Sequence, residues 1–204
     1  MIDWENLRCV VFDYGDTLCN NPYFGQLGRD FLHVVDTQIF GDCSPQWADP
    51  WLQGELTTDD IVKHLSSLTG TSSTEIMAGL ELGCSRIRPF PAIWQFAQSQ
   101  QAVGRKTALV TLNFDIFSRV IVPAVGFDKV FDIIVNSCDY RTDDKVHMWE
   151  IAFSQLDGCS FSNSLLIDDK QKYTDLFRAH GGMAYQYISD EEFSVWLNQE
   201  EVLK

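Results

Sequence analysis

Polar side chains follow three short apolar runs of this sequence, at the point where each run ends. They are Asp13, Asp16 and Thr17 after the first run, Thr111 and Asn113 after the second, and Asp168 and Asp169 after the third. Clustered carboxylates repel one another unless a cation neutralises them. Mg²⁺ is a hard cation that prefers such oxygen ligands. The pattern therefore indicates a site that combines carboxylates, a hydroxyl group and a metal ion.

The elements that must position these residues alternate along the chain. Apolar runs with the length of buried strands cover residues 9–12, 107–113, 131–137, 164–169 and 183–188. Helical patterns separate the later runs, at residues 89–101, 114–127, 145–156 and 172–182, and Pro123 interrupts the second of these. This alternation is typical of an α/β fold with an open parallel, Rossmann-like sheet. Ligands bind at the carboxyl ends of the strands in such sheets, where the polar residues lie.

A block with helical spacing and no convincing strand follows the first run. It contains helical patterns at residues 24–40, 57–70 and 73–87, and Thr57 begins the second with good N-cap chemistry. Residues 41–56 contain Pro45, Pro50 and Gly54 and indicate a loop or a broken short helix. We therefore expect an α/β core formed by residues 1–18 and 87–204, with an all-helical domain inserted at residues 19–86.

Composition excludes several classes of protein. The chain has 204 residues, 15 of them basic and 29 acidic, and its net charge of -14 disfavours binding to nucleic acid or to an anionic membrane. No apolar run reaches the length of about 18 residues that a membrane span needs. The first residues lack the pattern of a signal peptide, and the six cysteines are scattered without a CxxC pair. We expect a cytoplasmic, reduced protein that is a monomer or a small homo-oligomer.

The segments VVFDYGDTL, ALVTLN and LLIDD, with Lys145 between the second and the third, resemble the four motifs of the haloacid dehalogenase-like (HAD) superfamily. The resemblance covers the whole chain. It implies that residues 19–86 are a helical cap domain, and the stretch LQGELTTDDIVKHL resembles the G-x-I/L-T/S-x-E-E stretch of such caps. It also implies a hydrolase that uses an aspartate nucleophile and Mg²⁺.

The resemblance implies a role for each motif residue. Asp13 is the expected nucleophile, which forms an aspartyl-phosphate. Thr111 is expected to hold the phosphoryl oxygens and Lys145 to neutralise the charge of Asp13 and the phosphate. The expected contacts to phosphate or substrate come from Gly15, Asp16, Thr17, Leu112 and Asn113. The expected metal ligands are Asp13, the Gly15 carbonyl oxygen, Asp169, and Asp168 as a direct or indirect ligand.

Two departures from the family pattern bear on activity. Family phosphatases usually have an acid two residues after the nucleophile, where it acts as general acid and base. Gly15 occupies that position here, and Asp16 follows one residue later. The family also commonly has Pro-Asp-Pro after the lysine, whereas this chain has Val146-His147-Met148.

These features favour a Mg²⁺-dependent phosphatase that acts on a small phosphorylated metabolite. A 2-haloacid dehalogenase also attacks through an aspartate and dispenses with the second acid, but it needs no metal. A phosphonate hydrolase would need a cap lysine, for which Lys63 is the only candidate, and a mutase would need the missing acid. A binding or regulatory protein that kept the fold and lost turnover is the alternative from another class.

Other chemical groups are expected to have structural roles. The four histidines show no metal or triad spacing; they are His33, His64, His147 and His180. Trp47 and Trp51 are expected to form the core of the inserted helices. Residues 20–24, which include Tyr23 and Phe24, are expected to form a hinge and to line the substrate pocket.

Overall fold

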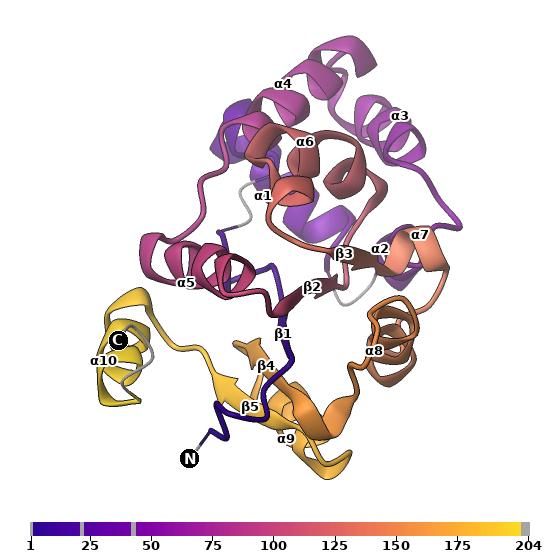
Figure 1. Cartoon of the computed structure of the whole chain (residues 1–204). Coiled ribbons are helices and arrows are strands. Elements are labelled where there is room, and N and C mark those ends of the chain that lie inside the picture. The colour runs from indigo at the N-terminus through magenta and orange to yellow at the C-terminus, as the bar shows by residue number, and fades with distance from the viewer. Residues whose placement is uncertain (1, 21–22, 42–43, 201–204) are drawn as a thin grey trace.

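A parallel sheet forms the centre of the protein in a computed structural model that describes residues 2–20, 23–41 and 44–200 (Figure 1). Its strands are β1 (Cys9–Phe12), β2 (Lys106–Thr111), β3 (Ile133–Asn136), β4 (Ser164–Asp168) and β5 (Met183–Gln186). They lie in the order β3-β2-β1-β4-β5, and every neighbouring pair is parallel. The predicted α/β fold with an open parallel sheet is confirmed.

Helices cover both faces of the sheet because the strand side chains alternate between two apolar clusters. Val10 and Phe12 belong to the cluster that includes α5 (Pro91–Ala102) and α10 (Asp190–Gln199). Cys9 and Val11 belong to the cluster under α8 (Lys145–Ser154) and α9 (Gln171–Ala179). Figure 1 shows the two pairs of helices on opposite sides of the strands. Strands buried on both faces explain why the runs are continuously apolar.

In the described residues between β1 and α5, four α-helices follow one another along the chain. They are α1 (Arg29–Gln38), α2 (Pro45–Leu52), α3 (Thr58–Thr69) and α4 (Ser73–Ser85), preceded by a 3-10 turn at Gly25–Leu27. Thr57 caps α3 as expected: it accepts a hydrogen bond from the Asp60 backbone N–H, and Asp60 accepts one from the Thr57 backbone N–H. In the predicted loop or broken helix, α2 forms with Pro50 inside it.

The inserted helices contact the rest of the protein at several points. The chain leaves β1 and returns before α5 at neighbouring positions, where the Phe90 N–H donates a 2.8 Å hydrogen bond to the Leu18 carbonyl oxygen. Trp51 Nε1 donates to Asp115 Oδ1 at 2.9 Å, and Gln53 Nε2 donates to Asp143 Oδ2 at 3.0 Å. The helices therefore pack against the loops that follow β2 and β3. The boundaries of a separate cap domain remain a prediction.

Several elements differ from the sequence-based expectation. The expected helix at residues 114–127 consists of a π-helical turn (Phe117–Ile121), α6 (Val122–Val125) and a 3-10 turn (Phe127–Lys129). Pro123 lies in the first turn of α6, directly after the π-helical turn, and the chain stays helical across it, so the proline does not interrupt the helix as the sequence indicated. Two helices were not expected, α7 (Ser137–Tyr140) and α10, and Phe161–Asn163 forms a short 3-10 turn.

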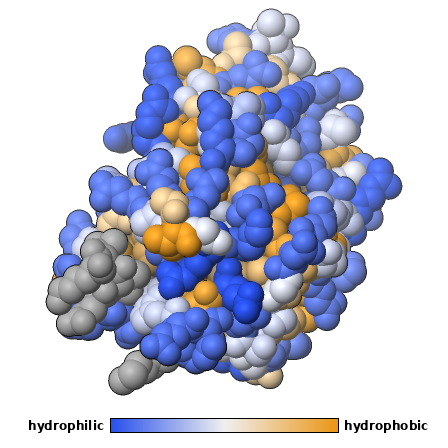
Figure 2. All heavy atoms as spheres, viewed as in Figure 1, coloured by the Kyte–Doolittle hydropathy of each residue, from blue (hydrophilic) through white to orange (hydrophobic). Residues whose placement is uncertain are grey.

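The surface of the protein is largely hydrophilic on the face drawn in Figure 2, where apolar residues form small groups. No helix in the described ranges is both long and apolar enough to cross a membrane.

Candidate active site

Three carboxylates meet at the carboxyl end of the sheet. Asp13 follows β1 directly, Asp168 ends β4 and Asp169 follows it, and β1 and β4 are neighbouring strands. One oxygen of each carboxylate lies within 4.8 Å of the others. Among the residues described, this is the one group of acidic, cysteine or histidine side chains with the spacing of a metal site, and no histidine belongs to it.

Lys145 brings a buried positive charge to the carboxylates. It is the first residue of α8, and the Asp144 side chain caps that helix by accepting hydrogen bonds from the Val146 and His147 backbone N–H groups. Lys145 Nζ lies 2.6 Å from Asp13 Oδ1 and donates to the Val110 carbonyl oxygen at 2.9 Å. The lysine therefore reaches the expected position although the residues after it depart from the family pattern.

The charges of this cluster are not balanced. Burial raises the pKa of the Asp13 carboxyl above its usual value, and the charge of Lys145 offsets only part of that rise. Burial and the neighbouring Asp13 raise the pKa of Asp168 to about 7. Burial alone would lower the pKa of Lys145, but the charges of Asp13 and Asp168 raise it.

A divalent cation fits this donor set. Asp168 Oδ2 is buried and accepts no hydrogen bond from the residues described, and Lys145 Nζ lies 3.6 Å away from it. A buried carboxylate oxygen that accepts no hydrogen bond and lies beside two further carboxylates is a costly arrangement that a cation would relieve. Carboxylate oxygens are also the ligands that Mg²⁺ takes in proteins. Asp13, Asp168 and Asp169 are therefore suited to hold Mg²⁺.

Asp169 is held in place by Thr17 and paired with Lys170. The Asp169 backbone N–H donates to Thr17 Oγ1 at 3.0 Å, and Thr17 is fully buried. Lys170 Nζ lies 2.5 Å from Asp169 Oδ2. Thr17 was predicted to contact phosphate or substrate. It does not line the cavity, and its hydroxyl group contacts Asp169.

A cavity of about 230 Å³ opens in front of these groups. Most of the predicted site residues line it: Asp13, Gly15, Asp16, Thr111, Leu112, Lys145 and Asp169. Lys170 and Tyr173 also line it, and the sequence analysis did not identify them. Lys170 is the N-cap residue of α9 and Tyr173 lies in the first turn of that helix. Both follow Asp169 closely in the sequence, and that proximity is the signal that could have found them.

Asp16 adopts a conformation that is uncommon for a residue with a side chain. Its φ of 54° is left-handed, and its backbone N–H donates to the Cys19 carbonyl oxygen at 2.9 Å. Asp16 is exposed and lines the cavity beside Gly15. Uncommon backbone conformations of this kind cluster at functional sites.

Asn113 does not line the cavity, because its polar groups bind other parts of the protein. Its backbone N–H donates to Ser137 Oγ at 2.9 Å, and its Oδ1 accepts hydrogen bonds from the Tyr23 hydroxyl at 2.5 Å and the Phe114 N–H at 2.9 Å. Tyr23 and Phe24 are themselves buried and outside the cavity lining. The structure thus places Asn113, Tyr23 and Phe24 behind the site. Of the other residues of the expected hinge, Asn20 is exposed and does not line the cavity, and Asn21 and Pro22 lie outside the described residues.

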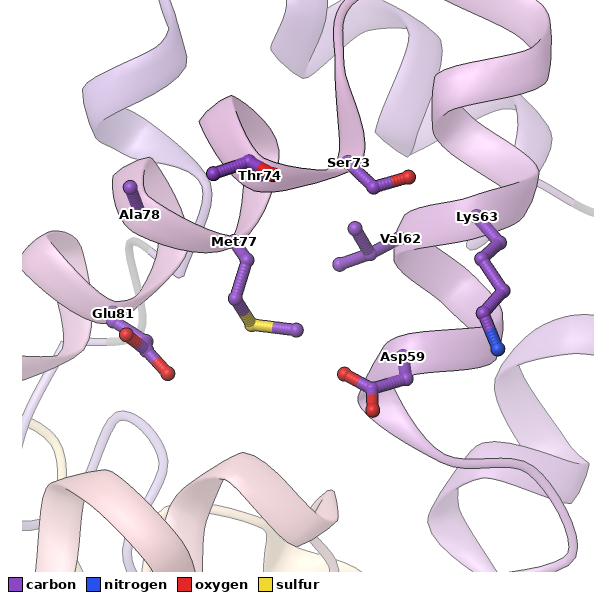
Figure 3. A pocket seen from close by; sticks show the side chains of 8 residues that line it. All are labelled: Asp59, Val62, Lys63, Ser73, Thr74, Met77, Ala78 and Glu81. Carbon is purple, nitrogen blue, oxygen red and sulfur yellow. The ribbon is translucent and has the colours of Figure 1, made fainter.

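A second, larger groove of about 420 Å³ lies between α3 and α4. Figure 3 shows Val62 and Met77 pointing into it, with Asp59, Lys63 and Glu81 around them. None of the predicted site residues lines this groove. The residues with catalytic potential are those at the sheet edge.

The two tryptophans of the inserted helices pack against other rings. Trp51 is fully buried and stacks on Phe114 with ring centroids 3.7 Å apart. Trp47 is half-buried and stacks on His64 at 3.8 Å. Neither tryptophan lines the sheet-edge cavity. Trp47 packs within the inserted helices, whereas Trp51 also packs against the loop that follows β2.

Comparison with known proteins relates the fold to one group of enzymes. No protein-family model matches the sequence, and no curated protein matches it. The HAD family enzyme BT-2542 of Bacteroides thetaiotaomicron, in complex with magnesium and inorganic phosphate, has a TM-score of 0.69 and 12% identity over 89% of this chain and 94% of its own. A predicted HAD-like family hydrolase of Porphyromonas gingivalis has a TM-score of 0.69 and 15% identity over 97% and 98% of the two chains.

An L-2-haloacid dehalogenase of Xanthobacter autotrophicus is also similar, with a TM-score of 0.62 and 16% identity over 97% of this chain and 83% of its own. The chain therefore has the haloacid dehalogenase-like fold, as the sequence motifs indicate. Enzymes with this fold include both metal-bound and dehalogenating members.

Proposed function

We propose that this chain is a cytoplasmic, Mg²⁺-dependent phosphatase of the HAD type that acts on a small phosphorylated metabolite. The observation that carries the proposal is the group of three carboxylates within 4.8 Å, one of them paired with a buried lysine at 2.6 Å. The similar enzyme from Bacteroides thetaiotaomicron, in complex with magnesium and inorganic phosphate, supports the same chemistry.

Asp13 is the proposed nucleophile. One of its carboxylate oxygens forms a bond to phosphorus while the bond between phosphorus and the ester oxygen breaks, which yields an aspartyl-phosphate and an alcohol. Water then attacks the phosphorus, releases inorganic phosphate and restores the carboxylate. Lys145 counters the negative charge of Asp13 and of the phosphate, so that the two can approach each other.

Thr111 and the backbone of Leu112 are proposed to hold the phosphoryl oxygens, since both line the cavity beside Asp13. Asp13, Asp168, Asp169 and the Gly15 carbonyl oxygen are proposed to hold Mg²⁺. The metal would stabilise negative charge on the phosphoryl group. Asn113 and Thr17 do not line the cavity and are proposed to hold the neighbouring site residues in position through their hydrogen bonds.

Asp16 is proposed to transfer the proton that the departing alkoxide needs. The position that usually carries this acid holds Gly15, but the left-handed turn at residue 16 leaves Asp16 in the cavity lining. General acid catalysis of this kind is worth about 10² to 10⁴ in rate, and most for poor leaving groups.

Residues 19–86 are proposed to act as a cap that limits the substrate to small molecules. The hydrogen bonds of Trp51 and Gln53 to Asp115 and Asp143, in the segments that follow β2 and β3, support this proposal. The protein is proposed to act as a monomer or a small homo-oligomer.

A 2-haloacid dehalogenase is the second candidate, favoured by Gly15 and by the similar Xanthobacter enzyme. In that reaction the Asp13 carboxylate would displace the halide from carbon. The buried Asp168 beside Asp169 argues against it, since two further carboxylates would repel a carboxylate substrate.

The test is hydrolysis of p-nitrophenyl phosphate and of a panel of sugar and nucleoside phosphates, with Mg²⁺ and with EDTA. We expect turnover that requires Mg²⁺ and that Asp13→Asn abolishes. Metal-independent release of halide from 2-chloropropionate, with no phosphate release, would establish the dehalogenase instead. No turnover on either class would leave a binding protein.

A further inference from the structure

Two lysines face the three carboxylates, and their surroundings differ. Lys145 has a side chain that is 2% exposed, and the Val110 carbonyl oxygen and Asp13 hold its ammonium group. Lys170 has a side chain that is 56% exposed, and its ammonium group contacts Asp169 Oδ2 at 2.5 Å. Lys145 is therefore fixed in the protein, whereas Lys170 reaches the site from solvent.

The oxygen that Lys170 contacts belongs to a proposed metal ligand. The other oxygen of Asp169 faces the Thr17 hydroxyl, with Thr17 Oγ1 3.5 Å from Asp169 Oδ1. Asp169 Oδ2 is thus the oxygen on which an ammonium group and a metal ion would compete. An ion pair with an exposed lysine contributes little free energy and can open at small cost.

We propose that Lys170 is an exchangeable counter-cation of the site, which neutralises Asp169 and gives up that carboxylate when a divalent cation binds. The proposal rests on one part of the proposed function, the binding of a divalent cation by the three carboxylates. It does not depend on phosphatase activity. Lys170 therefore lowers the affinity of the site for Mg²⁺, both by occupying one ligand oxygen and by repelling the incoming charge.

The released lysine remains in the same cavity. Lys170 lines the cavity together with Asp13, Thr111 and Lys145, so its ammonium group then faces the space in which a phosphate would lie. Mg²⁺ binding would thus free a positive charge for an anionic ligand. By linkage, Mg²⁺ and inorganic phosphate should each strengthen the binding of the other, and part of that coupling should depend on Lys170.

The test is titration calorimetry of Mg²⁺ into the wild-type chain, Lys170→Met, Lys170→Arg and Lys172→Met at one ionic strength. Lys172 is the matched control, because it is a neighbouring lysine whose ammonium group lies over the Tyr173 ring, 4.5 Å from the centroid. We expect the Kd for Mg²⁺ to fall about tenfold in Lys170→Met, the order expected when a unit charge next to a divalent cation is removed. Lys170→Arg and Lys172→Met should stay within about twofold of the wild type.

Equal or weaker Mg²⁺ binding by Lys170→Met overturns the proposal, and so does an equal gain in Lys172→Met. Binding by Lys170→Met alone, with none by the wild type, supports it. If neither binds Mg²⁺, both this proposal and the metal-dependent function are wrong. Tighter binding by Lys170→Met in a chain without phosphatase activity supports this proposal and overturns only the proposed function.

The coupling gives a second readout. Titration of inorganic phosphate with and without saturating Mg²⁺ should show a larger increase in phosphate affinity for the wild type than for Lys170→Met. An increase of the same size in both would contradict the role of the released lysine.

Discussion

The two ends of the sheet each have a lysine–aspartate pair, and the pairs differ in burial. At the carboxyl end, Lys145 and Asp13 lie 2.6 Å apart with side chains 2% and 13% exposed. At the amino end, Lys106, the first residue of β2, lies 3.2 Å from Asp132, with side chains 46% and 28% exposed.

The surroundings of the two aspartates also differ. Burial alone would raise the pKa of Asp132, but hydrogen bonds from the Thr107 backbone N–H and from Lys106 lower it. Burial raises the pKa values of Asp13 and Asp168. At the amino end, the Asp132 carboxylate accepts hydrogen bonds from β2 and so links β2 to the residue before β3. At the carboxyl end, burial disfavours the charged forms of Asp13 and Asp168. Such conditions are typical of functional sites and carry a cost in stability.

The largest effect should come from Asp13, the proposed nucleophile. Asp13→Asn should reduce kcat for phosphate ester hydrolysis by at least about 10⁴-fold, because no other carboxylate can take over the attack on phosphorus. Phosphate release assays on Asp13→Asn and Asp132→Asn measure this effect at the two ends of the sheet. Asp132→Asn should keep wild-type activity, and a comparable loss in both variants would contradict the assignment.

The buried lysine should matter for stability as well as activity. Lys145→Met leaves Asp13 and Asp168 without their counter-charge, and breaking a buried pair typically costs about 3–5 kcal/mol. Urea unfolding at pH 8 measures this loss. Lys106→Met should cost less than about 1 kcal/mol, because its pair is partly exposed. Equal losses would mean that burial does not distinguish the two pairs.

Removing a charge at the carboxyl end should stabilise the protein. The pKa of Asp168 is raised to about 7, so the folded state binds a proton more tightly than the unfolded state and loses stability as pH rises toward 7. Asp168→Asn should therefore be more stable than the wild type at pH 8 in EDTA, by about 1–3 kcal/mol. The gain should shrink toward pH 4 in unfolding curves, while Mg²⁺-dependent activity is lost. A gain independent of pH would contradict this account.

The smallest change in stability should come from Asp132→Asn, which should destabilise the protein, whereas Asp168→Asn should stabilise it. Its lowered pKa means that it stabilises the folded state above the usual aspartate pKa and that this contribution disappears as pH falls through the folded value. Asp132→Asn should lose about 1 kcal/mol at pH 7, and the difference should vanish at lower pH. Unfolding free energies from pH 3 to pH 8 measure this.

The sequence predicts which polar residues lie near the carboxyl ends of the strands, but it does not predict which of them face the cavity. Asp13, Thr111 and Asp168 could be placed together because the carboxyl ends of parallel strands meet at one edge. Lys145 could be placed through the order of the motifs. Thr17 and Asn113 were assigned to the substrate, but their positions depend on hydrogen bonds to residues 169, 23 and 137, which lie far away in the sequence.

Other features of the site depend on local geometry that residue types do not encode. Asp16 lines the cavity and has a left-handed φ, and aspartate is compatible with several loop conformations. Lys170 and Tyr173 reach the cavity because α9 begins at Gln171. The short helix α7 and the final helix α10 follow from packing against α2 and α5.

The central place of β1 in the sheet has a consequence for synthesis. Cys9, made early, pairs with Lys106 on one side and with Ser164 on the other. Pairings between residues this distant in sequence form slowly, because a long loop must close first. During synthesis, β1 can therefore pair with both neighbours only after β2 and β4 have been translated. Asp13 and Asp168 can come together only after β4 has been translated. Any shorter nascent chain leaves the apolar surface of β1 without its strand neighbour, and exposed surface of this kind favours aggregation.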